Sequence, residues 1–319
     1  MSSFPSLIDV ACVGCGGEGV PRFRKCGWTI RRCADCRMLF VTPRPRAADV
    51  DAMYRRGDPA GGIFPDELVK HERMRAMDEP AWERDLDRID RLRAPRSQRG
   101  ALLDFGCGDG AFVRLAARRG WRASGIDIGE WTREAAGRYR TPLFTGSLEE
   151  APFPPASFDV IYSTSTFEHL PDPSSILRRM RTLIRDGGIL FLGGLPNAEG
   201  LPARLLGPDW TDAEPPMHLN FFTPRALRAL ARRSGFVPAR VFSSGVGYGF
   251  GNLVFGRWMP RPPAPDPVPP SSRSKEHPEL SRTVPTPAYR IGRAVLNPIL
   301  RFSGLGNLLF LAARPSARE

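Results

Sequence analysis

The sequence predicts an α/β fold in which helices cover both faces of a doubly wound, mostly parallel sheet of seven strands. The first observation behind this prediction is the alternation of short apolar runs with amphipathic segments between residues 101 and 242. The second is a glycine-rich turn that directly follows the first apolar run. The third is the gathering of five of the six cysteines within residues 1–36, which predicts a small metal-bound unit before the sheet.

Length and composition predict an ordinary globular chain. It has 319 residues, of which 41% are hydrophobic and 25% are charged, so wholesale disorder is excluded. No apolar run approaches the length of a membrane-spanning helix. The first ten residues, MSSFPSLIDV, have neither a basic segment nor a long apolar stretch, so no secretory signal is expected. These observations predict a cytoplasmic location.

The net charge of +12 is concentrated at the two ends of the chain. Residues 1–46 carry a net charge of +5 and residues 255–319 carry +6, whereas the middle of the chain carries only +1. A nucleic-acid partner would therefore meet the ends. Two solvated basic flanks are the simpler interpretation, and the nearly neutral middle favours a small acceptor.

Two C-x-x-C pairs predict a structural zinc site. Cys12 and Cys15 form the first pair, Cys33 and Cys36 form the second, and seventeen residues separate them. Two such turns bring four thiolates together in the tetrahedral arrangement that suits zinc. Without a secretory signal this spacing favours a metal over disulfides, and a redox role is the alternative. Four protein ligands leave no open coordination position, so the zinc would be structural, and Cys26 remains outside the set.

Three regions follow from the pattern of apolar residues. Residues 1–46 are predicted to form a zinc ribbon, and residues 47–95 a helical linker or lid with a break at Pro80. Residues 96–319 are predicted to form the main domain. Its strands are expected at 101–105, 122–126, 142–144, 158–162, 189–192, 238–242 and 307–313, and its helices at 111–119, 130–139, 174–184 and 224–234.

An insertion, residues 244–304, is predicted between the last two strands of the sheet. It contains ten prolines between residues 260 and 287, which indicates a linker or a loop. Its glycine-rich beginning and its aromatic residues suggest an apolar cover for the acceptor, or a surface excursion packed against the sheet. The amphipathic residues 289–302 carry arginines and could contact a membrane surface or an apolar substrate.

The glycine-rich turn predicts a nucleoside-containing cofactor at the carboxyl ends of the strands. Asp127, at the end of the second strand, can accept both hydroxyls of a ribose. Gly106, Gly108 and Ala111 loosely satisfy a dinucleotide pattern. The pattern D-x-G-x-G-x-G is met in full, and its acid suits a cationic amino-acid group better than a pyrophosphate.

Several separated motifs resemble class I S-adenosylmethionine-dependent methyltransferases, which have a Rossmann-like sheet. LLDFGCGDGAFVRLAARRGWRASGIDIGE resembles their first two motifs, SFDVIYSTSTFEHLPDP their fourth strand and RDGGILFLGGLPN their fifth. PPMHLNFFTPRALRALARRSGF resembles a later segment of one large bacterial subgroup. Members of that subgroup often carry a ribbon whose end is similar to RRCADCRMLFVTPRP, so the resemblance covers roughly residues 10–243 and the last strand.

The resemblance implies a role for each residue of the cofactor site. Asp127 would hold the ribose, with Ile128 beside the adenine. Ser147 stands where relatives often have an acid for the adenine amine, and Leu148 follows it, so a hydroxyl or a backbone group would recognise the base. Ser163 would approach the methionine group. The residues expected to line the methionine end are Asp104, Gly106, Gly108 and Gly110.

Two histidines are candidate catalytic residues. His169 follows the fourth strand, and a role in anchoring its loop is the alternative to catalysis. His218 follows the fifth strand and would line the acceptor pocket. One subgroup of the family binds a metal through a Glu-x-x-Glu-His run in the loop of His169. Because Ser165 replaces the first carboxylate, this sequence argues against a catalytic metal and predicts a structural role for Glu168.

Three functions are compatible with these motifs. The first is an enzyme that methylates O, N or C of a small-molecule, glycan-linked or lipid-linked acceptor. The second is an RNA methyltransferase that uses the basic ribbon to bind RNA, although the loop STSTFEHLP lacks the Asn/Asp-Pro-Pro-Tyr/Phe run of many base N-methylating relatives. The third is a zinc-ribbon binding module with an inactive methyltransferase domain, against which the complete glycine motif argues. The sequence does not predict the oligomeric state.

Overall fold

The large sheet has the predicted doubly wound order. A computed structural model describes residues 6–55, 67–93, 99–245, 297–300 and 303–317. Within these residues, seven strands follow one another in the order β12-β13-β10-β9-β6-β7-β8. Only β13 runs antiparallel to its neighbours, so the prediction of a mostly parallel seven-stranded sheet is confirmed. The strands are β6 (Ala101–Phe105), β7 (Arg122–Asp127), β8 (Leu143–Thr145), β9 (Phe158–Thr164), β10 (Ile184–Pro196), β12 (Phe236–Ser243) and β13 (Leu308–Pro315).

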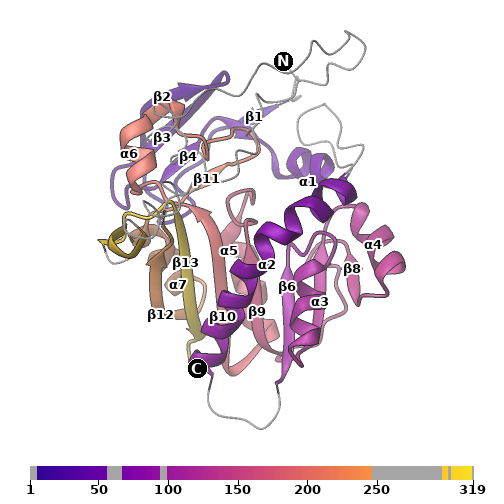
Figure 1. Cartoon of the computed structure of the whole chain (residues 1–319). Coiled ribbons are helices and arrows are strands. Elements are labelled where there is room, and N and C mark those ends of the chain that lie inside the picture. Colours follow the sequence, from indigo (N-terminus) through magenta and orange to yellow (C-terminus); the bar gives the residue numbers. More distant parts are fainter. Residues whose placement is uncertain (1–5, 56–66, 94–98, 246–296, 301–302, 318–319) are drawn as a thin grey trace, which may run out of the picture.

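Helices cover both faces of this sheet because alternate strand residues point to opposite sides (Figure 1). On one face, Leu102 and Tyr162 pack with residues of α2 (Glu67–Leu92) and α3 (Ala111–Arg118). On the other face, the neighbouring residue Leu103 packs with α5 (Pro173–Leu183) and α7 (Pro224–Arg233). The helix α4 (Trp131–Tyr139) lies against β8.

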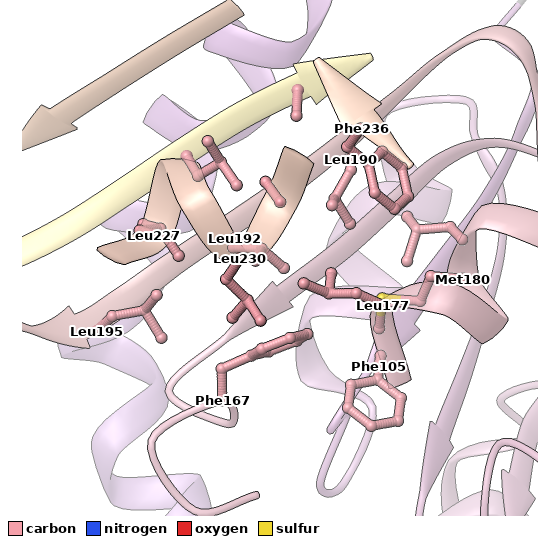
Figure 2. Packing of buried hydrophobic residues seen from close by; sticks show 14 of the residues in the cluster. Phe105, Phe167, Leu177, Met180, Leu190, Leu192, Leu195, Leu227, Leu230 and Phe236 are labelled. Atoms are coloured by element: carbon pink, nitrogen blue, oxygen red, sulfur yellow. The ribbon is translucent and has the colours of Figure 1, made fainter. Parts of the chain in front are cut away.

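The core on the α5 and α7 side also holds the loop that follows β9. Figure 2 shows Phe167 of this loop among the buried leucines of α5, α7 and β10. Its ring meets that of Phe105 edge-on, with 6.2 Å between the ring centroids. Burial of an aromatic side chain contributes about 1.5–3 kcal/mol. Phe167 therefore fixes the residues that follow it in the chain, Glu168 and His169.

The break predicted at Pro80 is wrong, because α2 runs through this proline as one helix of 26 residues. Proline lacks the N–H that would donate to the carbonyl one turn earlier, and it costs about 3 kcal/mol in a helix interior. The burial of Leu86 and Ile89 against the sheet offsets such a cost. Tertiary packing thus overrides the local signal.

The fifth strand is longer than the expected residues 189–192. β10 includes the Asp-Gly-Gly sequence that suggested a turn, and its pairing with β9 shifts register between Ile184 and Ile189. Gly187 has φ +75° at this irregularity. A second shift, opposite β13, lies between Leu192 and Leu195. Glycines therefore mark two irregular points within one strand, not its boundary.

The N-terminal segment forms a second, four-stranded sheet at one end of the large one (Figure 1). Its first three strands, β2 (Gly19–Lys25), β3 (Trp28–Cys33) and β4 (Leu39–Val41), belong to the predicted ribbon. Its fourth strand, β11 (Asn220–Phe221), comes from the chain after β10 and pairs with β4. The ribbon is thus completed by a distant part of the sequence. The short elements nearby are β1 (Leu7–Ile8), β5 (Arg44–Pro45), α1 (Ala47–Arg55), α6 (Leu201–Leu206) and η1 (Gly207–Asp209).

The four predicted metal-ligating cysteines lie together as free thiols. Cys12 Sγ is 3.4 Å from Cys36 Sγ, Cys15 Sγ is 3.4 Å from Cys33 Sγ, and all four sulfurs lie within 4.8 Å of one another. Zinc–sulfur bonds of about 2.3 Å in a tetrahedron place sulfurs roughly 3.8 Å apart, so this donor set fits zinc. The contact with Cys12 and burial both raise the pKa of Cys36, so four adjacent thiolates need a cation. Cys26 is exposed and lies outside the cluster.

The second cysteine pair is attached to the start of α7. Thr223 Oγ1 donates a hydrogen bond to the carbonyl of Cys36 at 2.8 Å and accepts one from the backbone N–H of Ala226 at 3.1 Å. The same hydroxyl therefore caps α7 and holds the ribbon. Cys12, Cys33 and Cys36 also belong to the hydrophobic cluster of the large sheet, so apolar burial stabilises the ribbon.

Most of the predicted insertion lies outside the described residues, including its proline-rich part, its aromatic residues and most of residues 289–302. Within the insertion, the structure describes residues 244–245, 297–300 and 303–304, and Leu300 is buried. Among the described helices, none combines the length and the hydropathy that crossing a bilayer requires.

We predict about one tightly bound zinc per chain, held by the four cysteines. Replacing Cys33 by Ser should remove the zinc and disorder the ribbon, because metal binding and folding are coupled in such small units. Metal analysis together with hydrogen exchange of β2 and β3 would measure both effects. The control is Cys26→Ser, which should keep the zinc, and a zinc-free wild type with a protected ribbon would contradict the prediction.

The hydroxyl of Thr223 should stabilise the whole chain. We expect Thr223→Val to lower the free energy of unfolding by about 1–3 kcal/mol, because it leaves a helix N-terminus and a carbonyl without their partner. Ser234, at the other end of α7, is a matched control, since its buried hydroxyl has no hydrogen-bond partner among the described residues. Urea unfolding would measure the free energy of unfolding of Thr223→Val and of the control Ser234→Ala. Equal stabilities of the two variants would refute this role of Thr223.

Candidate functional site

The glycine-rich turn joins β6 to α3 at the carboxyl edge of the large sheet. Gly106, Gly108 and Gly110 all have positive φ, and Gly110 begins α3 as its N-cap. A Cβ atom at Gly106 would lie 2.2 Å from Thr166 Oγ1, so the turn passes directly against the loop that follows β9. Only glycine allows this approach. The predicted cofactor loop and the predicted acceptor loop are therefore neighbours.

Asp127 and Asp104 place two carboxyl groups beside the turn. Asp127 ends β7 and accepts hydrogen bonds from the N–H groups of Gly108 at 3.0 Å and Gly129 at 2.9 Å. Asp104 is the penultimate residue of β6 and is buried; burial, and then the charge of Asp127, raise the pKa of Asp104 well above its usual value. A cationic group is therefore favourable here and a pyrophosphate is not. The ammonium and sulfonium groups of S-adenosylmethionine fit this chemistry.

Ser163 carries a buried hydroxyl on β9, the strand next to β6. It lies near the end of β9, it is almost fully buried, and its hydroxyl has no hydrogen-bond partner among the described residues. A buried hydroxyl without a partner costs about 1–3 kcal/mol, which a bound ligand would recover. The contact of Ser163 with the methionine group stays a prediction.

Ser147 and Leu148, two of the residues predicted to contact adenine, already have partners within the protein. Ser147 donates its backbone N–H to the carboxylate of Glu150 at 2.7 Å, and its hydroxyl accepts from the N–H of Glu150 at 3.3 Å. The side chain of Leu148 is buried in the core, which leaves its backbone for a base. Ile128 is half-buried immediately after Asp127. A contact between Ser147 and adenine would therefore compete with its bonds to Glu150.

His169 and His218, the two candidate catalytic residues, lie side by side. Their ring centroids are 4.8 Å apart. His169 Nδ1 lies 3.0 Å from the carbonyl oxygen of Met217, and His218 Nδ1 lies 2.7 Å from the carbonyl oxygen of Asp212. Burial, and then the neighbouring His218, lower the pKa of His169 to about 3. The imidazole of His169 is therefore neutral at physiological pH and is a weak base.

Glu168 completes a cluster with the two histidines, although the sequence predicted only a structural role for it. One ligand atom from each of the three residues lies within 4.8 Å of the others. The backbone carbonyl of Glu168 is structural, since it accepts the N–H groups of Leu219 and Asn220. Burial raises the pKa of its carboxyl group to about 8. Its Oε2 atom is buried without a hydrogen-bond partner in the described part of the chain. This oxygen can therefore bind a hydrogen-bond donor or a cation from a ligand.

Tyr54, which sequence reasoning missed, brings α1 into the site. Its hydroxyl lies 2.8 Å from His169 Nδ1. Burial raises its pKa, and so do the negative charges of Glu168 and Asp127, which places Tyr54 within electrostatic reach of both the acceptor side and the cofactor side. Tyr54 belongs to no motif in the sequence, and only its tertiary contacts reveal it.

The end of α1 also contacts the cofactor side. Arg55 forms an ion pair with Glu150 at 3.2 Å, and its carbonyl accepts the N–H of Glu130 at 3.3 Å. Exposed ion pairs of this kind stabilise by about 1 kcal/mol or less. The burial of Val50 and Met53 in the cluster of the ribbon anchors the rest of α1.

Comparison with known proteins agrees with this geometry. A family model described as "Methyltransferase domain" matches residues 70–240, more than half of the chain. The chain is 30% identical over 151 residues to the ubiquinone biosynthesis O-methyltransferase of Aeromonas salmonicida, which is 43% of this chain and 62% of the relative. It is also 30% identical over 216 residues to the Caulobacter vibrioides enzyme of the same name, covering 63% of this chain and 82% of the relative.

The chain thus spans less than two thirds of the length of the first of these relatives, but more than two thirds of the second. A solved S-adenosylmethionine-dependent methyltransferase of Archaeoglobus fulgidus has the same fold, with a TM-score of 0.50 and 17% identity. The alignment covers 77% of this chain and 98% of that structure. The match to the family model, the strand order and the glycine-rich turn lead to one conclusion: the chain belongs to the class I S-adenosylmethionine-dependent methyltransferases.

Proposed function

We propose that this protein transfers the methyl group of S-adenosylmethionine to an oxygen atom of a small-molecule acceptor. The observation that supports it most is the convergence of two sets of groups at one edge of the sheet. Asp104 and Asp127 suit the cofactor, while His169 and His218 lie in loops of the same edge. The relatives at 30% identity are named O-methyltransferases, which favours oxygen over nitrogen or carbon.

On the cofactor side, the chain would hold both ends of S-adenosylmethionine. Asp127 would accept the ribose hydroxyls, and Asp104 and the glycine turn would face the methionine group, with Ser163 as an added donor. The sulfonium methyl is already activated, so the protein mainly aligns it with the acceptor atom. Alignment and exclusion of water can contribute about 7–11 kcal/mol.

On the acceptor side, an oxygen nucleophile must lose its proton during the transfer. The cluster of Glu168, His169 and His218 is the set of titratable groups that the site offers next to the turn. We assign it the binding and deprotonation of the acceptor hydroxyl. α1 would cover the reacting groups through Tyr54, in keeping with the lid predicted for residues 47–95.

The cofactor assignment predicts that Asp127→Asn weakens S-adenosylmethionine and S-adenosylhomocysteine alike. A lost pair of charge-assisted hydrogen bonds costs about 1.5–3 kcal/mol, so both dissociation constants should rise about 10- to 150-fold in calorimetric titrations. Asn keeps the shape of Asp and one acceptor for the backbone N–H groups. Glu134→Gln, the same change on the exposed surface of α4, is the control. Unchanged affinity in Asp127→Asn would rule out the assignment.

The acceptor assignment predicts a different loss in His218→Gln. Affinity for S-adenosylhomocysteine should stay within about twofold, while methyl transfer should fall about 10²- to 10⁴-fold, because assistance to proton removal is lost. The assay uses radiolabelled S-adenosylmethionine with phenols, catechols, sugars, lipid-linked glycans and RNA. Transfer to hydroxylated small molecules supports the proposal. Transfer only to RNA, or full activity in His218→Gln, would overturn it.

A further inference from the structure

We propose that Glu168, His169 and His218 form a second metal site, which takes a divalent transition-metal ion and keeps coordination positions open for an oxygen of the acceptor. The site is separate from the four cysteines, and it differs in chemistry, with two imidazoles and one carboxylate in place of four thiolates. This metal site rests on the proposed function in one respect: an oxygen of the acceptor would occupy the open coordination positions.

The three donor side chains lie close together. His169 Nε2 lies 3.8 Å from Glu168 Oε1, and one ligand atom of each residue falls within 4.8 Å of the other two. Two separate loops are held together to achieve this. Glu168 and His169 follow β9, whereas His218 precedes β11, and the N–H groups of Leu219 and Asn220 donate to the carbonyl of Glu168 at 2.7 and 3.0 Å.

The hydrogen bonds of both imidazoles prepare them as metal ligands. A carbonyl oxygen can only accept, so the bonds to Met217 and Asp212 assign the proton to Nδ1 of each ring. A neutral imidazole protonated at Nδ1 has its lone pair at Nε2. Metal-binding histidines almost always donate the other ring N–H to a carbonyl or a carboxylate in this way. The phenol of Tyr54, at 2.8 Å from Nδ1 of His169, gives that nitrogen a second contact.

The carboxylate supplies an independent indication of a cation. Glu168 is 2% exposed, and its Oε2 atom has no hydrogen-bond partner among the described residues. A buried carboxylate oxygen in that state is costly, and a coordinated cation relieves the cost. Asp212, which is half-buried, adds negative charge near the cluster, and its carboxylate accepts the indole N–H of Trp210 at 3.0 Å.

The donor set decides the class of ion. Imidazoles suit zinc, iron, cobalt and nickel, a carboxylate extends the range to manganese, and three protein ligands leave open positions. The sequence argued against a metal here because Ser165 replaces a carboxylate of the related Glu-x-x-Glu-His run. The fold removes that objection, since His218 supplies a third donor from another loop. When bound, such an ion lowers the pKa of a coordinated hydroxyl.

The test is a titration of the full-length, zinc-loaded protein with cobalt(II) chloride alone, followed by absorption spectroscopy and calorimetry. Cobalt in a nitrogen and oxygen site lacks the intense thiolate charge-transfer band that cobalt in the four-cysteine site shows. We expect one further cobalt ion per chain without that band. Glu168→Gln and His218→Gln should each weaken its binding at least about tenfold. Glu214→Gln, an exposed carboxylate four residues before His218, is the matched control and should bind cobalt as the wild type does.

Circular dichroism, zinc content and affinity for S-adenosylhomocysteine show that each variant is folded. Cobalt binding only with a thiolate band, no cobalt beyond the zinc site, or equal affinity in both ligand variants would overturn the proposal. The readout does not depend on methyl transfer. A protein that binds cobalt as expected but methylates no hydroxyl would refute the proposed acceptor and leave the metal site intact.

Discussion

The two-residue strand β11 is the contact on which the functional site depends. On one side it pairs with β4 of the ribbon, where Asn220 lies opposite Phe40. On the other side, the N–H groups of Leu219 and Asn220 donate to the carbonyl of Glu168. His218 stands two residues before the first residue of this strand. The ribbon, the loop after β9 and the second histidine are therefore held by one short segment, so folding of the ribbon stabilises the loops that carry Glu168 and His218.

Electrostatics divides the carboxyl edge of the sheet into two neighbouring sides. Asp104 and Asp127 place two carboxyl groups beside the glycine turn, where the proposed sulfonium nucleoside would relieve their mutual repulsion. Glu168 and the histidines create a second polar space, in which Glu168 Oε2 has no hydrogen-bond partner among the described residues. Tyr54 lies near both. The arrangement suits a reaction in which a cationic methyl donor meets an oxygen that must lose a proton.

Much of this architecture could be predicted because its signals are local. Alternating apolar segments specify the strands and helices. The spacing of the cysteines brings together Cys12, Cys15, Cys33 and Cys36. The continuity of α2 through Pro80 and the length of β10 could not be predicted from local sequence, because packing against the sheet determines both. The pairing of β11 with the ribbon, and hence the contact of His218 with Glu168, joins segments far apart in sequence. No local pattern encodes such a contact. For the same reason, the sequence did not identify Tyr54 as a residue of the site.

The most direct test of this account is a crystal structure of the full-length protein with S-adenosylhomocysteine bound. The account predicts ribose hydroxyls on Asp127, the amino-acid group beside Asp104 and the glycine turn, and the sulfur directed toward Glu168, His169 and His218. A nucleoside bound elsewhere, or a sulfur that faces away from the histidines, would contradict it.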